Sequence, residues 1–221
     1  MRLISLVPSV TETLSEWGRT PVACTRFCER PDLEHVGGTK NPDLDRIVDL
    51  QPDLVVMDAE ENRREDHDAL VTRGVPVLAL HVRALADVNP SLATLSQRVR
   101  ATWRPVVLDA GSSARRRAFV PIWRRPWMAL GEPTYGASLL AHLGVATVTN
   151  AEAYPTITLE DMCDLGPDLV VAPSEPYPFG SRHLAELERV APTILVDGRD
   201  LFWWGVRTPD ALRRLELALR E

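Results

Sequence analysis

The sequence lacks the features that mark several common classes of protein. No apolar run approaches the roughly 18 residues needed to cross a membrane, so we expect no membrane-spanning segment. Positive charge is not in excess. The formal net charge is -6, and a field of this sign does not favour binding to the phosphates of nucleic acids. The 45% of hydrophobic residues is ordinary for a globular protein.

Cysteine and histidine are also sparse. The three cysteines, Cys24, Cys28 and Cys163, do not have the number or spacing of a disulfide framework. Cys24 and Cys28 are able to pair only if their local geometry allows it, and the favoured interpretation is reduced, partly buried thiols. The five histidines show no pair at metal-ligand spacing, and two cysteines alone are too few for a structural zinc site. We therefore predict no protein-bound metal.

Enzyme motifs are missing as well. The sequence contains no G-x-S-x-G, no Walker loop and no G-x-G-x-x-G. Residues 37–40, Gly-Gly-Thr-Lys, resemble a phosphate loop superficially, but a turn before a helix explains them better. Glu61, Glu132 and Glu175 are able to act in acid–base catalysis only if the fold brings them together. Otherwise they bind polar edges of a ligand or arginines of a partner. We predict no catalytic residues.

A repeated segment is the most informative feature of the sequence. Residues 52–56, Pro-Asp-Leu-Val-Val, recur as residues 167–171, and each run has the pattern of a short buried strand. A helix signal precedes each run, with Asn41 and Thr158 as candidate N-caps. Helices that end in Gly18 and Gly144 provide a second matching pair. A period near half the chain length predicts two similar lobes.

Alternating strands and helices predict α/β lobes with small, mainly parallel sheets. The predicted strands lie at residues 2–7, 21–24, 53–57, 76–80, 118–122, 168–172 and 193–196. The predicted helices lie at residues 10–17, 43–50, 62–73, 90–103, 135–143, 158–164, 181–190 and 208–220. This pattern divides the chain into an N-terminal α/β lobe (1–87), a connecting helix and linker (88–117) and a C-terminal α/β lobe (118–221). Pro105 is expected to stop the single connecting helix.

Aromatic residues gather in segments that follow the predicted strands. Pro and Gly punctuate these segments, which have no clean period, so they are interpreted as loops. An α/β fold binds its ligand beyond the carboxyl ends of its parallel strands, so these aromatics predict a ligand cleft. The alternative is that they belong to a lobe core or to the lobe interface. The residues concerned are Trp123, Trp127, Tyr135, Tyr177, Phe179, Trp203 and Trp204. His183 follows one of these loops and is a candidate to face the cleft.

Several of these segments together resemble the helical-backbone metal-receptor superfamily. These are the cluster-A substrate-binding proteins of importers for cobalamin, siderophores and haem, and the similarity is greatest to the cobalamin-binding subgroup. The resemblance covers almost the whole chain in order. The matching segments are 4–12, 37–42, 52–56, 61–63, 123–127, 175–179 and 197–199.

The resemblance implies two α/β lobes joined by one helix, a cleft between the lobes that holds a metal chelate, and an ABC permease as partner. The expected ligand is cobalamin or a related corrinoid, with haem or a ferric siderophore as other possibilities, and no cofactor is expected to be covalently bound. The predicted ligand-binding residues are Ser9, Phe27, Cys28, Glu61, Asn62, Trp123, Trp127, Tyr135, Glu175, Tyr177, Phe179, His183, Trp203, Trp204 and Arg207. Glu65 and Glu186 are candidates for docking to arginines of the permease. We expect a monomer.

The N-terminal residues, Met-Arg-Leu-Ile-Ser-Leu-Val-Pro-Ser, do not have the pattern of a signal peptide. As it stands, the sequence predicts a cytoplasmic protein, and a periplasmic or extracellular one if an export signal has been removed. One alternative hypothesis is a cytoplasmic carrier or regulatory module for a corrinoid or metal chelate that is not coupled to transport. A second is a small hydrolase, which requires Glu61, Glu175 or His183 to converge.

Overall fold

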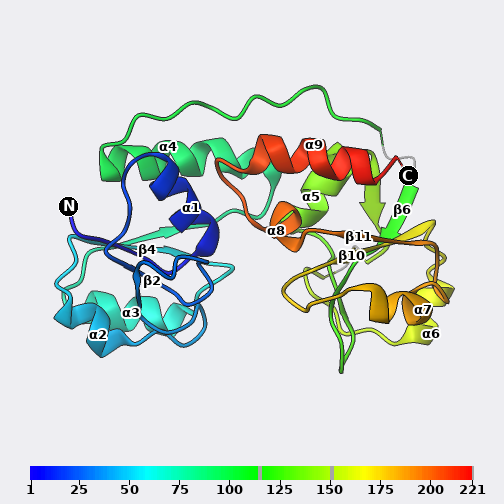
Figure 1. Ribbon diagram of the computed structural model, residues 1–221, viewed down its shortest axis with the longest axis horizontal. Coiled ribbons are helices and arrows are strands. Elements are labelled where there is room, and N and C mark those ends of the chain that lie inside the picture. Colours follow the sequence, from blue (N-terminus) through cyan, green and yellow to red (C-terminus); the bar gives the residue numbers. More distant parts are fainter. Residues whose placement is uncertain (114–115, 150–151, 221) are drawn as a thin grey trace. The chain divides into compact units, whose positions relative to one another are not determined.

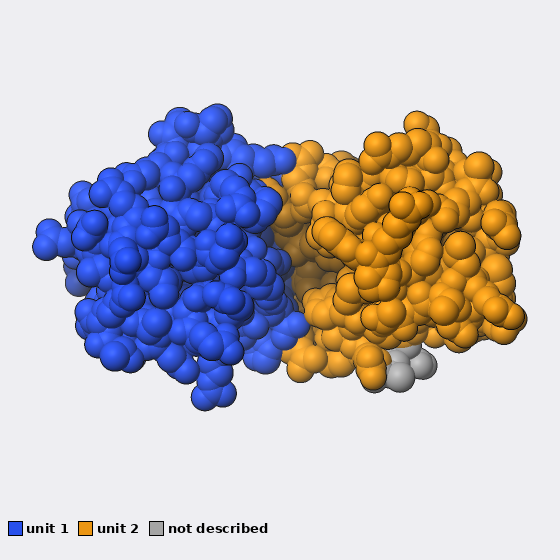
Figure 2. Space-filling view, turned by 90° about the horizontal axis from the view of Figure 1, so that it is seen from below, with its two compact units in different colours: residues 1–82, 86–106, 204–207 blue, residues 83–85, 107–203, 208–221 orange. Residues whose placement is uncertain are grey.

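The computed structural model describes residues 1–113, 116–149 and 152–220. The chain forms two compact units, shown in different colours in Figure 2. Unit 1 consists of residues 1–82, 86–106 and 204–207, and unit 2 of residues 83–85, 107–203 and 208–221. Among the described residues, no helix is long and apolar enough to cross a membrane.

Unit 1 is a five-stranded parallel sheet with helices on both faces (Figure 1). Its strands are β1 (Leu3–Ser5), β2 (Ala23–Cys24), β3 (Glu34–His35), β4 (Leu54–Asp58) and β5 (Val77–Leu80), in the order β3-β2-β1-β4-β5. Its helices are α1 (Pro8–Glu16), α2 (Leu44–Asp49), α3 (Arg64–Thr72) and α4 (Val88–Val99). A short 3-10 helix, η1 (Leu85–Asp87), precedes α4. In Figure 1, α2 and α3 cover one face of the sheet, and α1 and α4 lie on the other.

Unit 2 repeats this plan with a four-stranded parallel sheet in the order β11-β10-β6-β9. The strands of this sheet are β6 (Arg116–Phe119), β9 (Val145–Thr147), β10 (Leu169–Pro173) and β11 (Thr193–Val196). A separate antiparallel pair consists of β7 (Pro121–Trp123) and β8 (Met128–Ala129). The helices are α5 (Tyr135–His142), α6 (Leu159–Asp164), η2 (Ser181–His183), α7 (Leu184–Leu187), α8 (Gly198–Phe202) and α9 (Thr208–Ala218).

The repeated Pro-Asp-Leu-Val-Val segments form equivalent strands. Leu54 pairs with Leu3 of β1, and Leu169 pairs with Ala118 of β6. The aspartate before each strand has the same role, because its carboxylate accepts a hydrogen bond of 2.6 Å from a backbone N–H at the start of the neighbouring strand or just before it. The donor is Arg2 for Asp53 and Arg117 for Asp168. The repeat is therefore structural, and the prediction of two similar α/β units is confirmed.

Local signals explain most of the element boundaries. Gly18 and Gly144 follow their helices with φ of 66° and 83°, a conformation that glycine adopts without strain. Thr158 caps α6 in a capping box, as predicted. The Asn41 prediction is wrong. Asp43 is the N-cap of α2, because its side chain accepts a hydrogen bond from the Arg46 N–H at 3.0 Å.

Other sequence predictions also need correction. The helix predicted for residues 90–103 is α4, which ends at Val99, ahead of Pro105, because Arg100 adopts a left-handed conformation. Trp123 lies in β7, so it does not belong to a loop. Tyr135 begins α5, in agreement with the helix predicted for residues 135–143. Helix α8 covers part of the segment before Trp203 that was interpreted as loop. Strands β3, β8 and β9 were not predicted.

Candidate functional site

The carboxyl ends of parallel strands meet at one edge of each sheet, and most of the predicted site residues follow these ends. In unit 2 this edge carries a cluster of aromatic rings. Trp123 and Tyr177 meet edge to face, with centroids 5.6 Å apart, and Trp127 stacks on Phe179 at 6.0 Å. Tyr177 and Phe179 are 4.7 Å apart. The structure therefore brings together four of the aromatic residues that were singled out in the sequence.

The four rings of the aromatic cluster differ in their exposure to solvent. Phe179 is buried, Trp127 and Tyr177 are partly exposed, and Trp123 is 44% exposed. The Arg124 guanidinium lies 5.8 Å from the centroid of the Trp127 ring. An exposed tryptophan supported by packed rings provides a rigid apolar surface for a ligand with a broad face.

His183 belongs to the base of this cluster. Its ring packs edge on against Tyr177 and Phe179, at 5.6 and 5.4 Å, and it is 5% exposed. Its Nδ1 accepts a hydrogen bond from the Gly180 N–H at 3.1 Å. Burial lowers the pKa of His183, and the nearby arginines Arg182 and Arg124 add to this effect. The neutral ring thus packs in the cluster and fixes the turn that follows Phe179.

Glu175 lies between the carboxyl end of β10 and the start of α8. A side chain at Gly198 would place its Cβ 2.5 Å from the Cγ of Glu175 and 2.6 Å from its backbone nitrogen. Glycine at position 198 is thus required for this close approach. The Gly198 N–H also donates to the Ser174 hydroxyl at 3.0 Å, which joins the two loops.

Three other predicted aromatic residues are buried. The Tyr135 hydroxyl lies 3.0 Å from the Thr208 hydroxyl, and burial raises its pKa. Trp203 belongs to unit 2 and Trp204 to unit 1, and each is at most 9% exposed. These three rings therefore do not join the exposed surface of the aromatic cluster.

The equivalent edge of unit 1 is polar. Asn62 joins three segments: its amide donates to the carbonyl groups of Leu6 and Thr39, at 3.1 and 3.0 Å, and its oxygen accepts from the Asp58 N–H at 2.9 Å. Asp58, which the sequence analysis missed, ends β4 and is 1% exposed. One of its carboxylate oxygens accepts from the Glu60 N–H at 2.8 Å, and the other has no hydrogen-bond partner.

Burial is the main cause of the raised pKa values of two carboxyl groups at this edge. It raises the pKa of Asp58 to about 7, and the nearby Glu61 and Glu60 add to the shift. It also raises the pKa of the partly exposed Glu61, against the attraction of Lys40. In the sequence, Asp58 is marked only by its place directly after an apolar strand segment, which does not show that it is buried.

The remaining predicted residues of unit 1 differ in accessibility. Ser9 and Cys28 are buried, whereas Phe27 is 49% exposed and its ring lies 4.7 Å from the Arg26 guanidinium. Arg207 forms a bidentate ion pair with Glu12, with distances of 2.7 and 2.9 Å. Its charge is therefore engaged within unit 1.

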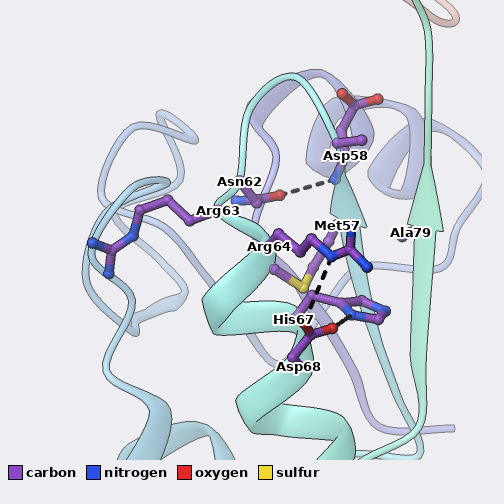
Figure 3. A pocket seen from close by; sticks show the side chains of 9 residues that line it. Met57, Asp58, Asn62, Arg63, Arg64, His67, Asp68 and Ala79 are labelled. Atoms are coloured by element: carbon purple, nitrogen blue, oxygen red, sulfur yellow. Dashed lines mark hydrogen bonds and ion pairs between the residues drawn. The ribbon is translucent and has the colours of Figure 1, made fainter.

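A pocket of about 420 Å³ also opens on unit 1 (Figure 3). Arg64, His67 and Asp68 line it together with the apolar side chains of Met57 and Ala79. These polar groups contact one another, because Asp68 lies 3.7 Å from Arg64 and 2.9 Å from His67. Across residues 1–113, 116–149 and 152–220, no group of three or more His, Cys, Asp or Glu side chains is arranged to hold a metal ion.

Solved structures share this fold across almost the whole chain. A periplasmic vitamin B12-binding protein of Vibrio cholerae, BtuF, matches with a TM-score of 0.78, covering 99% of this chain and 96% of that chain at 17% identity. The periplasmic haem-binding protein BhuT matches with a TM-score of 0.77 at 18% identity, covering 99% and 97%. The fold is that of two-lobed periplasmic binding proteins.

Sequence comparisons agree with this class. Residues 3–102 match the family described as periplasmic binding protein. A vitamin B12-binding protein of Salmonella choleraesuis is 23% identical over 189 residues, which cover 77% of this chain and 71% of that protein. One of Pectobacterium carotovorum is 21% identical over 224 residues, covering 91% and 81%.

The resemblance to the helical-backbone metal receptors is thereby confirmed. The matching relatives and solved structures are named as binding proteins for vitamin B12 or haem, which agrees with the prediction of a binding protein rather than an enzyme.

Proposed function

We propose that this protein binds a corrinoid, with cobalamin as the expected ligand, and presents it to an ABC importer. The observation that carries this proposal is the aromatic cluster of unit 2, where the exposed face of Trp123 is supported by Tyr177. A corrin ring has a broad apolar face that such a surface covers well. The relatives named as vitamin B12-binding proteins support the same ligand.

Titration of the purified protein with cyanocobalamin and, separately, with haemin tests the ligand. We expect saturable heat with cyanocobalamin and a weaker or absent response with haemin, followed by calorimetry and by the visible spectrum. If haemin bound saturably and cyanocobalamin did not, the ligand would be haem and the corrinoid proposal would be wrong. Absence of both would contradict the proposed function.

We further propose that Glu65 and Glu186 dock the protein to arginines of a permease. The two residues lie in the first turns of α3 and α7, which follow the equivalent strands β4 and β10. Glu65 is exposed, whereas Glu186 is paired with Arg124 at 2.9 Å. Docking through Glu186 therefore requires an arginine that competes with Arg124.

Binding to a reconstituted permease–ATPase complex tests this surface. Glu65→Gln and Glu186→Gln should each weaken the association while leaving affinity for the ligand unchanged. Glu188→Gln, at the C-cap of α7, is the matched control. Equal association of all three variants and the wild type would exclude these two glutamates as docking residues.

A further inference from the structure

Two cysteines of unit 1 form a buried pair at the edge that carries the predicted site residues. Cys24 is the last residue of β2, and Cys28 follows after a turn closed by a hydrogen bond of 3.1 Å from the Cys28 N–H to the Thr25 carbonyl. The turn brings the two thiol groups into hydrogen-bonding contact. Cys24 is 0% and Cys28 4% exposed.

Two hydroxyl groups surround the sulfur of Cys28. Thr11, from the first turns of α1, and Thr25 each place a hydroxyl 3.2 Å from it. The hydrogen bond from Cys24 is the largest cause of a pKa for Cys28 that is lowered to about 6, and the same contact raises the pKa of Cys24. The contact thus makes Cys28 the more acidic sulfur of the pair, as the attacking cysteine is in dithiols that undergo disulfide exchange.

We propose that Cys24 and Cys28 are a redox pair that oxidises to an intramolecular disulfide. The oxidant is a disulfide, either of a small thiol or of a dithiol oxidase. The Cys28 thiolate attacks one sulfur of this oxidant, which forms a mixed disulfide and releases one thiolate. Cys24, whose proton passes to the thiolate released in the first step, attacks the Cys28 sulfur and releases the second thiolate. Two protein thiols are oxidised, and one disulfide is reduced to two thiols.

The bond closes a small loop that carries Arg26 and Phe27. The Arg26 N–H donates to the Gly37 carbonyl at 2.9 Å, and a side chain at Gly38 would meet both Arg26 and Phe27 at 3.1 Å. The loop thus packs on the turn at residues 37–40. A disulfide at its base would reduce the freedom of the loop backbone that carries the exposed Phe27. This inference does not depend on the identity of the ligand.

Cys163 provides an internal control. It is exposed on α6, and its thiol donates only a long hydrogen bond, 3.8 Å, to the Arg189 carbonyl. It has no partner cysteine among the described residues, because the other two lie in the pair. A disulfide-exchange reagent is therefore expected to leave Cys163 either free or as a simple adduct.

The test uses the full chain with Cys163→Ser, treated with glutathione disulfide at mildly alkaline pH, then unfolded without reductant for thiol counting and intact mass. We expect both thiols to disappear with a loss of two hydrogen atoms and no retained glutathione. With Cys24→Ser added, Cys28 should instead retain one glutathione as a stable mixed disulfide.

Because both sulfur atoms are buried, the same variant is also refolded in a glutathione redox buffer. Formation of the internal disulfide by either route supports the proposal. Two free thiols after both treatments, or glutathione adducts without the internal bond, would overturn it. Circular dichroism of each variant before treatment establishes that it is folded.

Discussion

Equivalent strands of the two units end in different residues. Strand β4 ends in Asp58, which pairs with Leu80 of β5, whereas β10 ends at the equivalent position in Pro173, which pairs with Val196 of β11. After Asp58 the chain forms a polar edge of carboxylates and an amide. After Pro173 it forms the loop that contributes Tyr177 and Phe179 to the aromatic cluster. The repeated strands, which we call the frame, thus support two kinds of surface. The loops beyond the strands vary more freely in sequence than the strands themselves.

The largest expected effect on stability comes from truncating core side chains at equivalent strand positions of the two units. Ile4 of unit 1 pairs with Val55, and Phe119 of unit 2 pairs with Val170; both side chains are fully buried. Phe119→Ala should destabilise unit 2 by about 3–5 kcal/mol, and Ile4→Ala unit 1 by about 2–5 kcal/mol. Urea unfolding followed by tryptophan fluorescence measures both. A loss below about 1 kcal/mol at either position would show that the frame does not depend on that core.

The second prediction concerns Asp58 at the end of β4, whose equivalent in unit 2 is the uncharged Pro173. Burial raises the pKa of Asp58 from 3.8 to about 7, so the folded state binds the proton more tightly than the unfolded state. The stability from this group is fully present below about pH 4 and is lost as the pH rises to about 7. Asp58→Asn keeps a neutral group at all pH values, and should therefore stabilise the protein by about 2–4 kcal/mol at neutral to alkaline pH.

Thermal unfolding at several pH values measures this difference. The advantage of Asp58→Asn should vanish in acid, and the exposed control Glu16→Gln should show no such trend. A variant that is less stable than the wild type above about pH 7 would mean that the ionised Asp58 carboxylate is stabilised in the fold.

The sequence was sufficient for the frame but not for the surfaces. The repeated strands follow from local pattern, and Gly18 and Gly144 mark helix ends through their backbone conformation. The edge strands β3 and β8 have only two residues each, too few for a periodic signal. Burial of Asp58 and Tyr135 depends on residues distant in the chain, so linear pattern did not separate Tyr135 from the exposed Trp123. Whether the buried predicted residues contact a ligand stays a prediction.

The smallest stability effect tests the symmetry of the frame. Asp53 and Asp168 make the same hydrogen bond to a neighbouring strand, so replacement of either by alanine should cost about 1 kcal/mol. Chemical denaturation of the two single variants gives the comparison. Costs that differ by more than about 1 kcal/mol would show that the repeated aspartates are equivalent in geometry but not in energy.

The central claim is that the aromatic cluster of unit 2 binds the ligand, and calorimetric titration of Trp123→Ala with cyanocobalamin tests it most directly. Removing an exposed aromatic face that contacts the ligand should weaken affinity by roughly 10-fold to 100-fold, equivalent to about 1.4–2.8 kcal/mol. The control Trp17→Ala, at the C-cap of α1 in unit 1, should bind as the wild type does. Wild-type affinity in Trp123→Ala would contradict the account.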